Sequence, residues 1–398
     1  FPINVAFLRG TTADSDGNIT MEKEALTLDA LAMATAVRNC GGIVIVQVER
    51  LADRGTLNPR LVKVPGILVD CVVVGKPENH WQTFGEPYSP AFSCEIRVPM
   101  QSIPPMEMSP RKIIVRRAAF ELKPNSVVNL GIGMPEGVSQ VAHEERILEY
   151  ATLTAESGLI GGLPMGGLNF GTGVNCDALI DEPYQFDFYD GGGLDIAFLG
   201  MAETDAEGNV NVSKFGPRFT GPGGFIDISQ NAKKVCFVGL FTAGARISVE
   251  DGALKINQEG RERKFVRKVE HKTFSGKHAA GKKQSVLYIT ERCVFSLCEE
   301  GLELIEIAPG IDLKTQVLRV MDFEPIMRTP PRLMDERIFR LAPMGIKEDL
   351  LTIPMEDRFA YHAADNIFFI NLENYYMKTS EEIKKMKEIV GRILEPIG

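Results

Sequence analysis

The stretch Ala6–Asn18 reads AFLRGTTADSDGN, and the stretch Ala197–Asn209 reads AFLGMAETDAEGN. Ala, Phe, Leu, Asp, Gly and Asn recur in the two stretches at a constant offset of 191 residues, without a gap. The same offset places IVIVQV (Ile43–Val48) on KVCFVG (Lys234–Gly239), and both are apolar runs short enough for buried strands. A period this long is typical of a duplicated domain, because solenoid repeats are only about 20 to 50 residues long.

The two copies differ in what precedes them. Only five residues precede the first AFL, whereas a long stretch that begins near Lys112 precedes the second. We therefore expect an α/β protein with two related open α/β domains and mainly parallel sheets, residues 1–108 and 109–398. Since the chain begins with Phe and not Met, we expect the first domain to be incomplete in this chain.

The composition is that of a globular protein that can bury large cores. The chain has 398 residues, of which 44% are hydrophobic, and no run of eighteen apolar residues. The start FPINVAFLRG has neither a basic region nor a cleavage site, which predicts a cytoplasmic protein without a membrane partner. A net charge of −9 argues against a nucleic-acid partner.

The seven cysteines are an odd number, contain no C-x-x-C pair and mostly stand in apolar runs. We expect them to be reduced thiols of the core. They are Cys40, Cys71, Cys94, Cys176, Cys236, Cys293 and Cys298.

The second copy alternates helical and strand patterns. Residues 111–122 have apolar positions at helical spacing, 126–133 form an apolar strand, 134–145 a helix with Pro135 in its first turn, and 150–157 a second strand. This order predicts a parallel-sheet unit. Ligands in open α/β sheets gather beyond the carboxyl ends of strands, and two glycine-rich loops fall there.

The two loops are candidates for a site. In LTAESGLIGGLP (Leu153–Pro164), Glu156 stands beside a glycine tract that would let a large ligand approach it, although local chemistry alone favours a plain loop residue. The loop GIGMPEG (Gly131–Gly137) either binds a phosphate or amide through backbone N–H groups or is a simple strand-to-helix turn. It fails the G-x-G-x-x-G fingerprint, so a nicotinamide cofactor is not expected.

No metal site is expected. The five histidines lack ligand spacing and adjoin no Cys or Ser in a nucleophile motif, so we interpret them as structural. They are His80, His143, His271, His278 and His362.

Several long motifs resemble the family I coenzyme A transferases. They include RGTTADSDGNITMEKEA (Arg9–Ala25), TAESGLIGGLPMGGLNFG (Thr154–Gly171), FDFYDGGGLDIAFLGMAE (Phe186–Glu203) and GNVNVSKFGPRFTGPGGFIDI (Gly208–Ile228). The resemblance runs from Phe1 to about Phe339 and is nearest to the single-chain acetate or propionate (short-chain acyl) type. The family has two related domains, in agreement with the repeat, and a further N-terminal portion that this chain lacks.

The resemblance implies roles for individual residues. Glu156, in the E-S-G motif, corresponds to the nucleophile that becomes a γ-glutamyl-CoA thioester. Gly224 and Phe225 correspond to backbone oxyanion donors, with Gly223 allowing close approach; a β-turn would explain the same residues without the family. The CoA-contacting loop corresponds to Gly131, Ile132, Gly133, Met134 and Pro135.

We therefore expect a cofactor-free enzyme that moves coenzyme A, as a substrate, between short-chain carboxylic acids by a ping-pong route. An acyl-CoA hydrolase on the same scaffold and a non-catalytic subunit that binds CoA or a metabolite are the alternatives. The family implies a homodimer or homotetramer, and implies that the missing N-terminal portion is needed to complete the site.

Two further segments have a simple interpretation. Thr379 and Glu382 have capping-box spacing before apolar residues at helical intervals, which predicts an amphipathic helix over 379–394. The basic run RERKFVRK (Arg261–Lys268) is interpreted as a solvated strand face.

Overall fold

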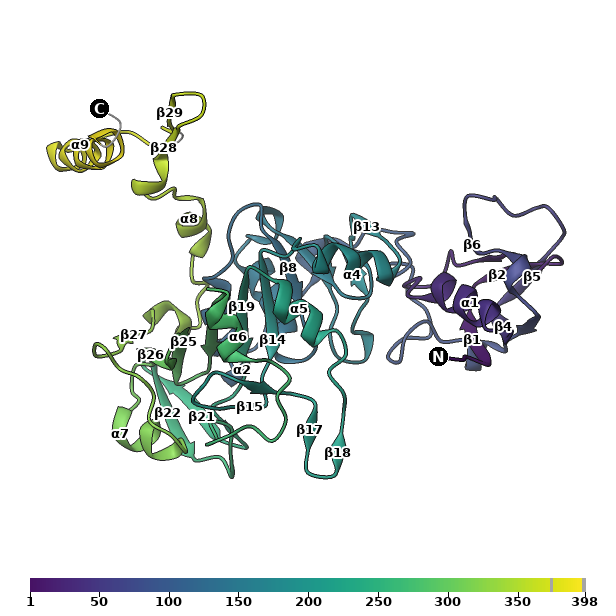
Figure 1. The fold of residues 1–398 in the computed structure, drawn as a ribbon, viewed down its shortest axis with the longest axis horizontal. Helices are drawn as coiled ribbons and strands as arrows, with labels where there is room; N and C mark the ends of the chain where they lie inside the picture. Colours follow the sequence, from purple (N-terminus) through teal and green to yellow (C-terminus); the bar gives the residue numbers. More distant parts are fainter. Residues whose placement is uncertain (373–374, 396–398) are drawn as a thin grey trace. The chain divides into compact units, whose positions relative to one another are not determined.

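The computed structural model describes residues 1–372 and 375–395. The chain divides into two compact units, Phe1–Met344 and Gly345–Gly398 (Figure 1). The first unit is a mixed α/β structure whose main sheets are largely parallel. The predicted domain boundary at residues 108/109 stays a prediction.

A ten-stranded sheet forms the centre of the first unit. Its order is β13-β10-β9-β8-β14-β19-β24-β25-β26-β27, and the five strands from β9 to β24 are parallel. The bounds are β8 Val127–Leu130, β9 Thr152–Ala155, β10 Leu159–Ile160, β13 Ala178–Leu179, β14 Ile196–Gly200, β19 Lys234–Val238, β24 Ser285–Ile289, β25 Cys293–Cys298, β26 Gly301–Ile307 and β27 Arg332–Leu333.

Helices cover this sheet on both faces. Ala197 and Leu199 of β14 belong to a core cluster with Phe225 of α5, whereas Phe198 between them is fully buried outside that cluster. Figure 1 shows α5 and α6 beside the central strands, and α2 packs on β19 and β24. Such double coverage explains why the parallel strands are continuous apolar runs. The helices are α2 Pro110–Ala119, α3 Gly137–Glu144, α4 Glu182–Asp190, α5 Phe225–Asn231, α6 Gly276–Gly281 and α7 Leu313–Gln316.

A smaller parallel sheet, β1-β4-β7, lies in the N-terminal part of the first unit with the helix α1 against it. Val5 of β1 pairs with Ile43 of β4, and Ile196 of β14 pairs with Lys234 of β19. Both members of the second pair lie 191 residues after those of the first, so the sequence repeat preserves strand register. The bounds are β1 Val5–Arg9, α1 Ala30–Asn39, β4 Ile43–Val48 and β7 Cys71–Val74.

The repeat also preserves a turn after the first strand of each copy. The Asn18 backbone N–H donates to Asp14 Oδ1 at 2.9 Å, and the Asn209 N–H donates to Asp205 Oδ1 at 3.1 Å. The flanking strands pair in the same register in both copies: β2 Thr12–Asp14 with β3 Ile19–Thr20, and β15 Glu203–Thr204 with β16 Val210–Asn211.

A glycine closes each of these turns. The Gly66 N–H donates to Asn18 Oδ1 at 2.9 Å, and the Gly276 N–H donates to Asn209 Oδ1 at 3.2 Å. A Cβ atom would lie 2.0 Å from a turn carbonyl at either glycine. The two glycines therefore have the same role, although they are not at the 191-residue offset.

The remaining strands form short sheets. They are β5 Arg50–Ala52 and β6 Val62–Val64, which join β2 and β3; β11 Leu163–Pro164 with β12 Gly173–Val174; β17 Lys214–Phe215 with β18 Arg218–Phe219; β20 Thr242–Ala243 with β23 Glu262–Arg263; and β21 Arg246–Glu250 with β22 Ala253–Gln258.

The second unit consists of α8 Ile346–Leu351, the hairpin β28 Phe359–His362 and β29 Ile367–Ile370, and α9 Ser380–Leu394. The predicted capping box is confirmed, because Thr379 Oγ1 accepts from the Glu382 N–H at 3.2 Å and the Glu382 carboxylate accepts from the Thr379 N–H at 2.9 Å. Over the described ranges, no helix has both the length and the apolar composition needed to cross a bilayer.

Two sequence interpretations are wrong in part. Cys176, Cys236 and Cys293 are buried, but three cysteines are exposed: Cys40, Cys71 and Cys94. The basic run 261–268 contributes only a two-residue strand, and Lys264 turns inward to donate to the Met201 carbonyl at 2.8 Å. Burial lowers the pKa of Lys264 to about 8, so this lysine is not part of a solvated face.

The close approach at Gly276 predicts a stability effect. Gly276→Ala should lower the free energy of unfolding by about 1 to 3 kcal/mol, because the new Cβ would displace the Glu207 carbonyl of the turn. Gly281→Ala is the matched control, since it lies in the same helix with nothing within 4 Å of its Cβ position. Urea unfolding measures both; equal stability of the two variants would contradict the prediction.

Candidate active site

Glu156 stands at the tip of the turn between the antiparallel strands β9 and β10. The Gly158 N–H donates to the Ala155 carbonyl at 3.1 Å, and the Ser157 hydroxyl donates to the Gly171 carbonyl at 2.6 Å. These bonds fix the backbone on the C-terminal side of Glu156. The turn therefore holds the carboxyl group at the carboxyl end of β9, the outermost of the five parallel strands.

The sequence interpretation, that the glycine tract after Glu156 leaves room for a ligand, is wrong. Neighbouring protein segments fill the space beside these glycines. A Cβ at Gly158 would lie 1.9 Å from the Ile180 carbonyl oxygen, and one at Gly162 would lie 2.4 Å from the Val174 carbonyl oxygen. At Gly161 the Asp177 carboxylate occupies the same space. The glycines are needed because neighbouring protein segments pack against them.

The space beside the Glu156 carboxyl group comes from a different glycine. A Cβ at Gly224 would lie 2.4 Å from Glu156 Oε2 and 2.5 Å from the Phe186 ring, so only glycine permits this approach. Burial raises the pKa of Glu156 above its ordinary value. Within residues 1–372 and 375–395, no hydrogen bond or ion pair engages its carboxylate. A partly desolvated, unpaired carboxylate is free to attack an electrophile.

A buried polar network supports the strand that carries Glu156. The Tyr189 hydroxyl donates to Thr154 Oγ1 at 2.7 Å and accepts from the amides of Gln185 at 2.7 Å and Asn129 at 3.3 Å. These four side chains are fully or almost fully buried. The network ties β8, β9 and α4 together, and so fixes the position of the nucleophile candidate.

The predicted oxyanion residues lie beside Glu156. Gly223 has φ +55°, which favours glycine, and Gly224 precedes α5. The Phe225 N–H donates to the Pro222 carbonyl at 3.2 Å, and the Phe225 ring stacks on Phe237 with centroids 5.8 Å apart. The structure thus brings Gly224 into contact with the nucleophile candidate, and it shows that the Phe225 N–H already has a partner.

The predicted CoA-contacting loop follows β8. Gly133 has φ +82°, and its N–H donates to Glu136 Oε1 at 2.8 Å. Met134 and Pro135 form a 3₁₀ turn with Glu136, and Ile132 is exposed. Gly131 donates its N–H to the Phe198 carbonyl at 2.9 Å and so joins the loop to β14. The loop and Glu156 follow adjacent parallel strands.

Sequence reasoning missed a second acid near Glu156. Glu182 is half-buried in the first turn of α4, and its N–H donates to the Leu28 carbonyl at 3.2 Å. Burial, and then the negative charges of Asp29 and Glu156, raise the pKa of Glu182 to about 7. No local pattern signals this acid, because its environment includes a loop more than 150 residues away along the chain.

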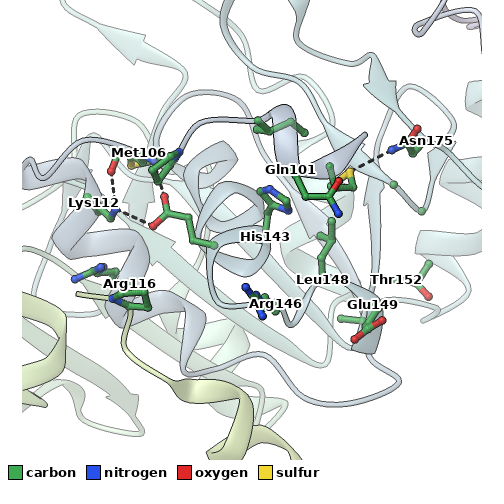
Figure 2. Close-up of a pocket in the computed structure, with 18 of the residues that line it drawn as sticks. Gln101, Met106, Lys112, Arg116, His143, Arg146, Leu148, Glu149, Thr152 and Asn175 are labelled. Atoms are coloured by element: carbon green, nitrogen blue, oxygen red, sulfur yellow. Dashed lines mark hydrogen bonds and ion pairs between the residues drawn. The ribbon is translucent and has the colours of Figure 1, made fainter. Parts of the chain in front are cut away.

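A cavity of about 1200 Å³ lies away from Glu156 and reaches Thr152 at the opposite end of β9. Figure 2 shows His143, Arg146 and Leu148 among the residues that line it. In this cavity Lys112 Nζ forms an ion pair with the Glu144 carboxylate at 2.7 Å.

The His, Cys, Asp and Glu side chains are dispersed over the described part of the chain. No group of three or more His, Cys, Asp or Glu side chains lies together there. The histidines are scattered in space as they are in sequence: His80 faces Glu24, and His271 Nδ1 lies 2.6 Å from Ser213 Oγ.

The comparisons with known proteins agree on one family. A sequence model described as Coenzyme A transferase matches residues 2–75. Caffeate CoA-transferase of Acetobacterium woodii is 49% identical over 345 residues, which cover 85% of this chain and 66% of that protein. Acetate CoA-transferase YdiF of Escherichia coli K12 is 46% identical over 343 residues, which cover 86% and 64%.

The crystal structure of acyl-CoA transferase YdiF from Escherichia coli O157:H7, in a thioester complex with CoA, superposes with a TM-score of 0.80. It is 45% identical, and the match covers 87% of this chain and 65% of that one. The chain belongs to the family I coenzyme A transferases. Within the family it is of the single-chain type represented by YdiF and the caffeate enzyme, and it spans about two thirds of their length.

The raised pKa of Glu182 predicts a pH-dependent stability. The unfolded chain releases this proton near pH 4.5, whereas the folded chain holds it to about pH 7, so the free energy of unfolding falls as pH rises through this window. Glu182→Gln cannot ionise and should be the more stable form above pH 7, by on the order of 1 kcal/mol after solvent screening is allowed for.

Urea unfolding at pH 5 and pH 8 measures the effect. Glu78→Gln, at an exposed glutamate of the 3₁₀ turn Pro77–Asn79, is the control. If the free energies of unfolding of Glu182→Gln and the unsubstituted protein differ by the same amount at both pH values, the pKa of Glu182 is not raised.

Proposed function

We propose that this protein transfers coenzyme A between carboxylic acids through a covalent thioester on Glu156. The observation that carries the proposal is the unpaired Glu156 carboxylate in contact with Gly224. A structural carboxylate at this depth would be expected to have a hydrogen-bond or cation partner, because an unpaired buried charge is costly. A nucleophile, in contrast, must keep its lone pairs available.

The chemistry follows from the carboxylate. A Glu156 oxygen attacks the carbonyl carbon of an acyl-CoA, the C–S bond breaks, and a mixed anhydride and CoA thiolate result. The thiolate attacks the glutamyl carbonyl, which forms the γ-glutamyl-CoA thioester and releases the first acid as its carboxylate. A second carboxylate then attacks the thioester and reverses these steps. No net proton, electron or cofactor is needed.

Two loops supply the surroundings for this chemistry. Each tetrahedral intermediate carries an oxyanion, and backbone N–H donors at Gly224 and Phe225 would stabilise it. Because the Phe225 N–H donates to Pro222 in this structure, its use requires that bond to open or be shared. The loop Gly131–Pro135, one strand away, would receive part of coenzyme A.

The names of the relatives bear on which acids exchange coenzyme A. The two relatives are named for acetate and for caffeate, which differ by a whole aromatic ring. The resemblance in the sequence favours short-chain acids, and the caffeate enzyme extends the range to an aryl acid.

The repeat supports a related proposal about the fold. The shared strand register, the shared turn and the equivalent glycines Gly66 and Gly276 are best explained by two domains that arose by duplication. One domain contributes Asp29 to the surroundings of Glu182, and the other contributes Glu156. The reacting groups would then lie where the two domains meet.

A trapping experiment tests the proposed function. With an acyl-CoA and no acceptor acid, the full-length enzyme should form a CoA adduct that borohydride reduces to an alcohol at Glu156, with loss of activity. Tandem mass spectrometry of the peptide that contains Glu156 locates the change. Glu156→Gln should form no adduct, and Glu78→Gln should form it normally. An adduct on a cysteine, or exchange by freshly prepared Glu156→Gln, would refute the proposal.

The contact with Gly224 predicts a second effect. Gly224→Ala should slow adduct formation by about 100-fold, because its Cβ must displace the Glu156 carboxyl group from a distance of 2.4 Å. Gly281→Ala, whose Cβ position is open, should react at the normal rate. Stopped-flow measurement of thiol release gives both rates. A normal rate for a folded Gly224→Ala protein would show that the contact between Gly224 and Glu156 has no effect on adduct formation.

A further inference from the structure

Packing and hydrogen bonds hold the segment 89–98 against the segment 171–177. Phe92 and Val174 belong to one buried cluster. The Val98 N–H donates to Asn175 Oδ1 at 2.8 Å, and Asn175 Nδ2 donates to the Val98 carbonyl at 2.8 Å. Each segment carries a cysteine between or next to these contacts, Cys94 in the first and Cys176 in the second.

The backbone at this boundary is fixed by further contacts of Asn175. Its carbonyl accepts from Arg97 Nη1 at 2.6 Å, and its Nδ2 also donates to Met100 Sδ at 3.1 Å (Figure 2). The φ angles of Asn175 and Cys94 are +60° and +61°, in the left-handed region. Residues other than glycine keep this conformation only where the surrounding structure imposes it. The fold therefore sets the backbone at Cys94 and directly before Cys176.

The two thiols are neighbours in space. Cys176 is 6% exposed, whereas Cys94 is exposed. Burial, and then the Cys94 thiol, raise the pKa of Cys176 to about 12. A thiol perturbs another in this way only at short range. One member of the pair is thus open to solvent, and the other is shielded behind it.

The turn that carries Cys94 is closed on itself. The N–H groups of Glu95 and Ile96 donate to the Pro90 carbonyl at 2.9 and 3.3 Å. The Ser93 hydroxyl donates to the Glu95 carboxylate at 2.9 Å. The turn presents Cys94 at the surface, so a small reagent in solvent reaches Cys94 before it reaches Cys176.

This arrangement suits thiol–disulfide exchange in two steps. The Cys94 thiolate attacks one sulfur atom of a small disulfide, breaks its S–S bond and releases one small thiolate. The Cys176 thiol then gives its proton to water, and its thiolate attacks the Cys94 sulfur of the mixed disulfide and releases the second small thiolate. Two protein thiols are oxidised, and one small disulfide is reduced to two thiols.

We propose that Cys94 and Cys176 form a site of reversible disulfide formation by small disulfides such as oxidised glutathione. Cys176 belongs to one buried cluster with Ala155 and Leu159, on either side of Glu156. The bond would therefore link the segment 89–98 to the hairpin that carries the candidate nucleophile. Bond formation needs no coenzyme A, so this inference is independent of the reaction proposed at Glu156.

Oxidation of the whole chain tests the inference. The protein is incubated with oxidised glutathione, quenched with acid, alkylated in urea and digested without reduction. Mass spectrometry should find the peptides of Cys94 and Cys176 joined, whereas the exposed Cys71 should carry glutathione. If Cys94 ends as a glutathione mixed disulfide while Cys176 is alkylated, the inference is overturned.

Variants separate the two steps. Cys176→Ser should accumulate glutathione on Cys94, because the second step is removed. Cys94→Ser should leave Cys176 reduced, because the reagent does not reach a buried thiol. Glutathione on Cys176 in the Cys94→Ser protein would contradict the proposed order of attack. Circular dichroism checks that both variants fold.

Limited proteolysis follows the effect on the backbone. Trypsin cleavage after the exposed Arg97 should slow by about tenfold on oxidation and recover with dithiothreitol, because a link at Cys94 opposes the local unfolding that a protease needs. Cleavage after the exposed Arg60 is the matched control and should not change. Oxidised Cys176→Ser should be cleaved after Arg97 at the normal rate. An unchanged rate after Arg97 in the oxidised parent would show that no link to the hairpin forms.

Discussion

The contact between the Glu156 carboxylate and Gly224 is the constraint on which the rest of this site depends. A carboxylate that is partly desolvated and has no cation beside it raises the energy of the folded state. Three features of the surrounding structure hold the carboxylate in this position despite that cost. They are the tight turn after β9, the polar network around Tyr189 and the absence of a side chain at Gly224. Removal of any of these supports would let the carboxylate turn toward water, where it would be a weaker nucleophile.

The second acid is explained by the same constraint. Glu182 lies near enough to Glu156 and Asp29 for their negative charges to raise its pKa, so near neutral pH the cluster holds part of a proton. Protonated Glu182 lessens the repulsion that a substrate carboxylate would meet beside Glu156. The cavity that Glu182 shares with Leu26 and Phe170 therefore combines an apolar wall with a reduced negative charge.

Much of the fold could be predicted from the sequence, since it depends on local pattern and on the repeat. The strands Ile43–Val48 and Lys234–Val238 and the final helix lie where the apolar periodicity places them. The site was only partly predictable. Glu156 stands in a motif, but the packing function of Gly158 depends on the Ile180 carbonyl, and the inward turn of Lys264 depends on Met201. Such contacts are set by the tertiary structure, and no local pattern in the chain encodes them.

Isotope transfer from the acceptor acid tests the central claim most directly. If an acid attacks a thioester on Glu156, one of its carboxyl oxygen atoms must remain on the glutamate after each turnover. Incubation with an acyl-CoA and an acid labelled with oxygen-18 should therefore add heavy oxygen to the peptide that contains Glu156, as read by tandem mass spectrometry. Coenzyme A transfer that leaves Glu156 unlabelled would show that coenzyme A passes from one acid to the other without a thioester on Glu156, and would contradict the account.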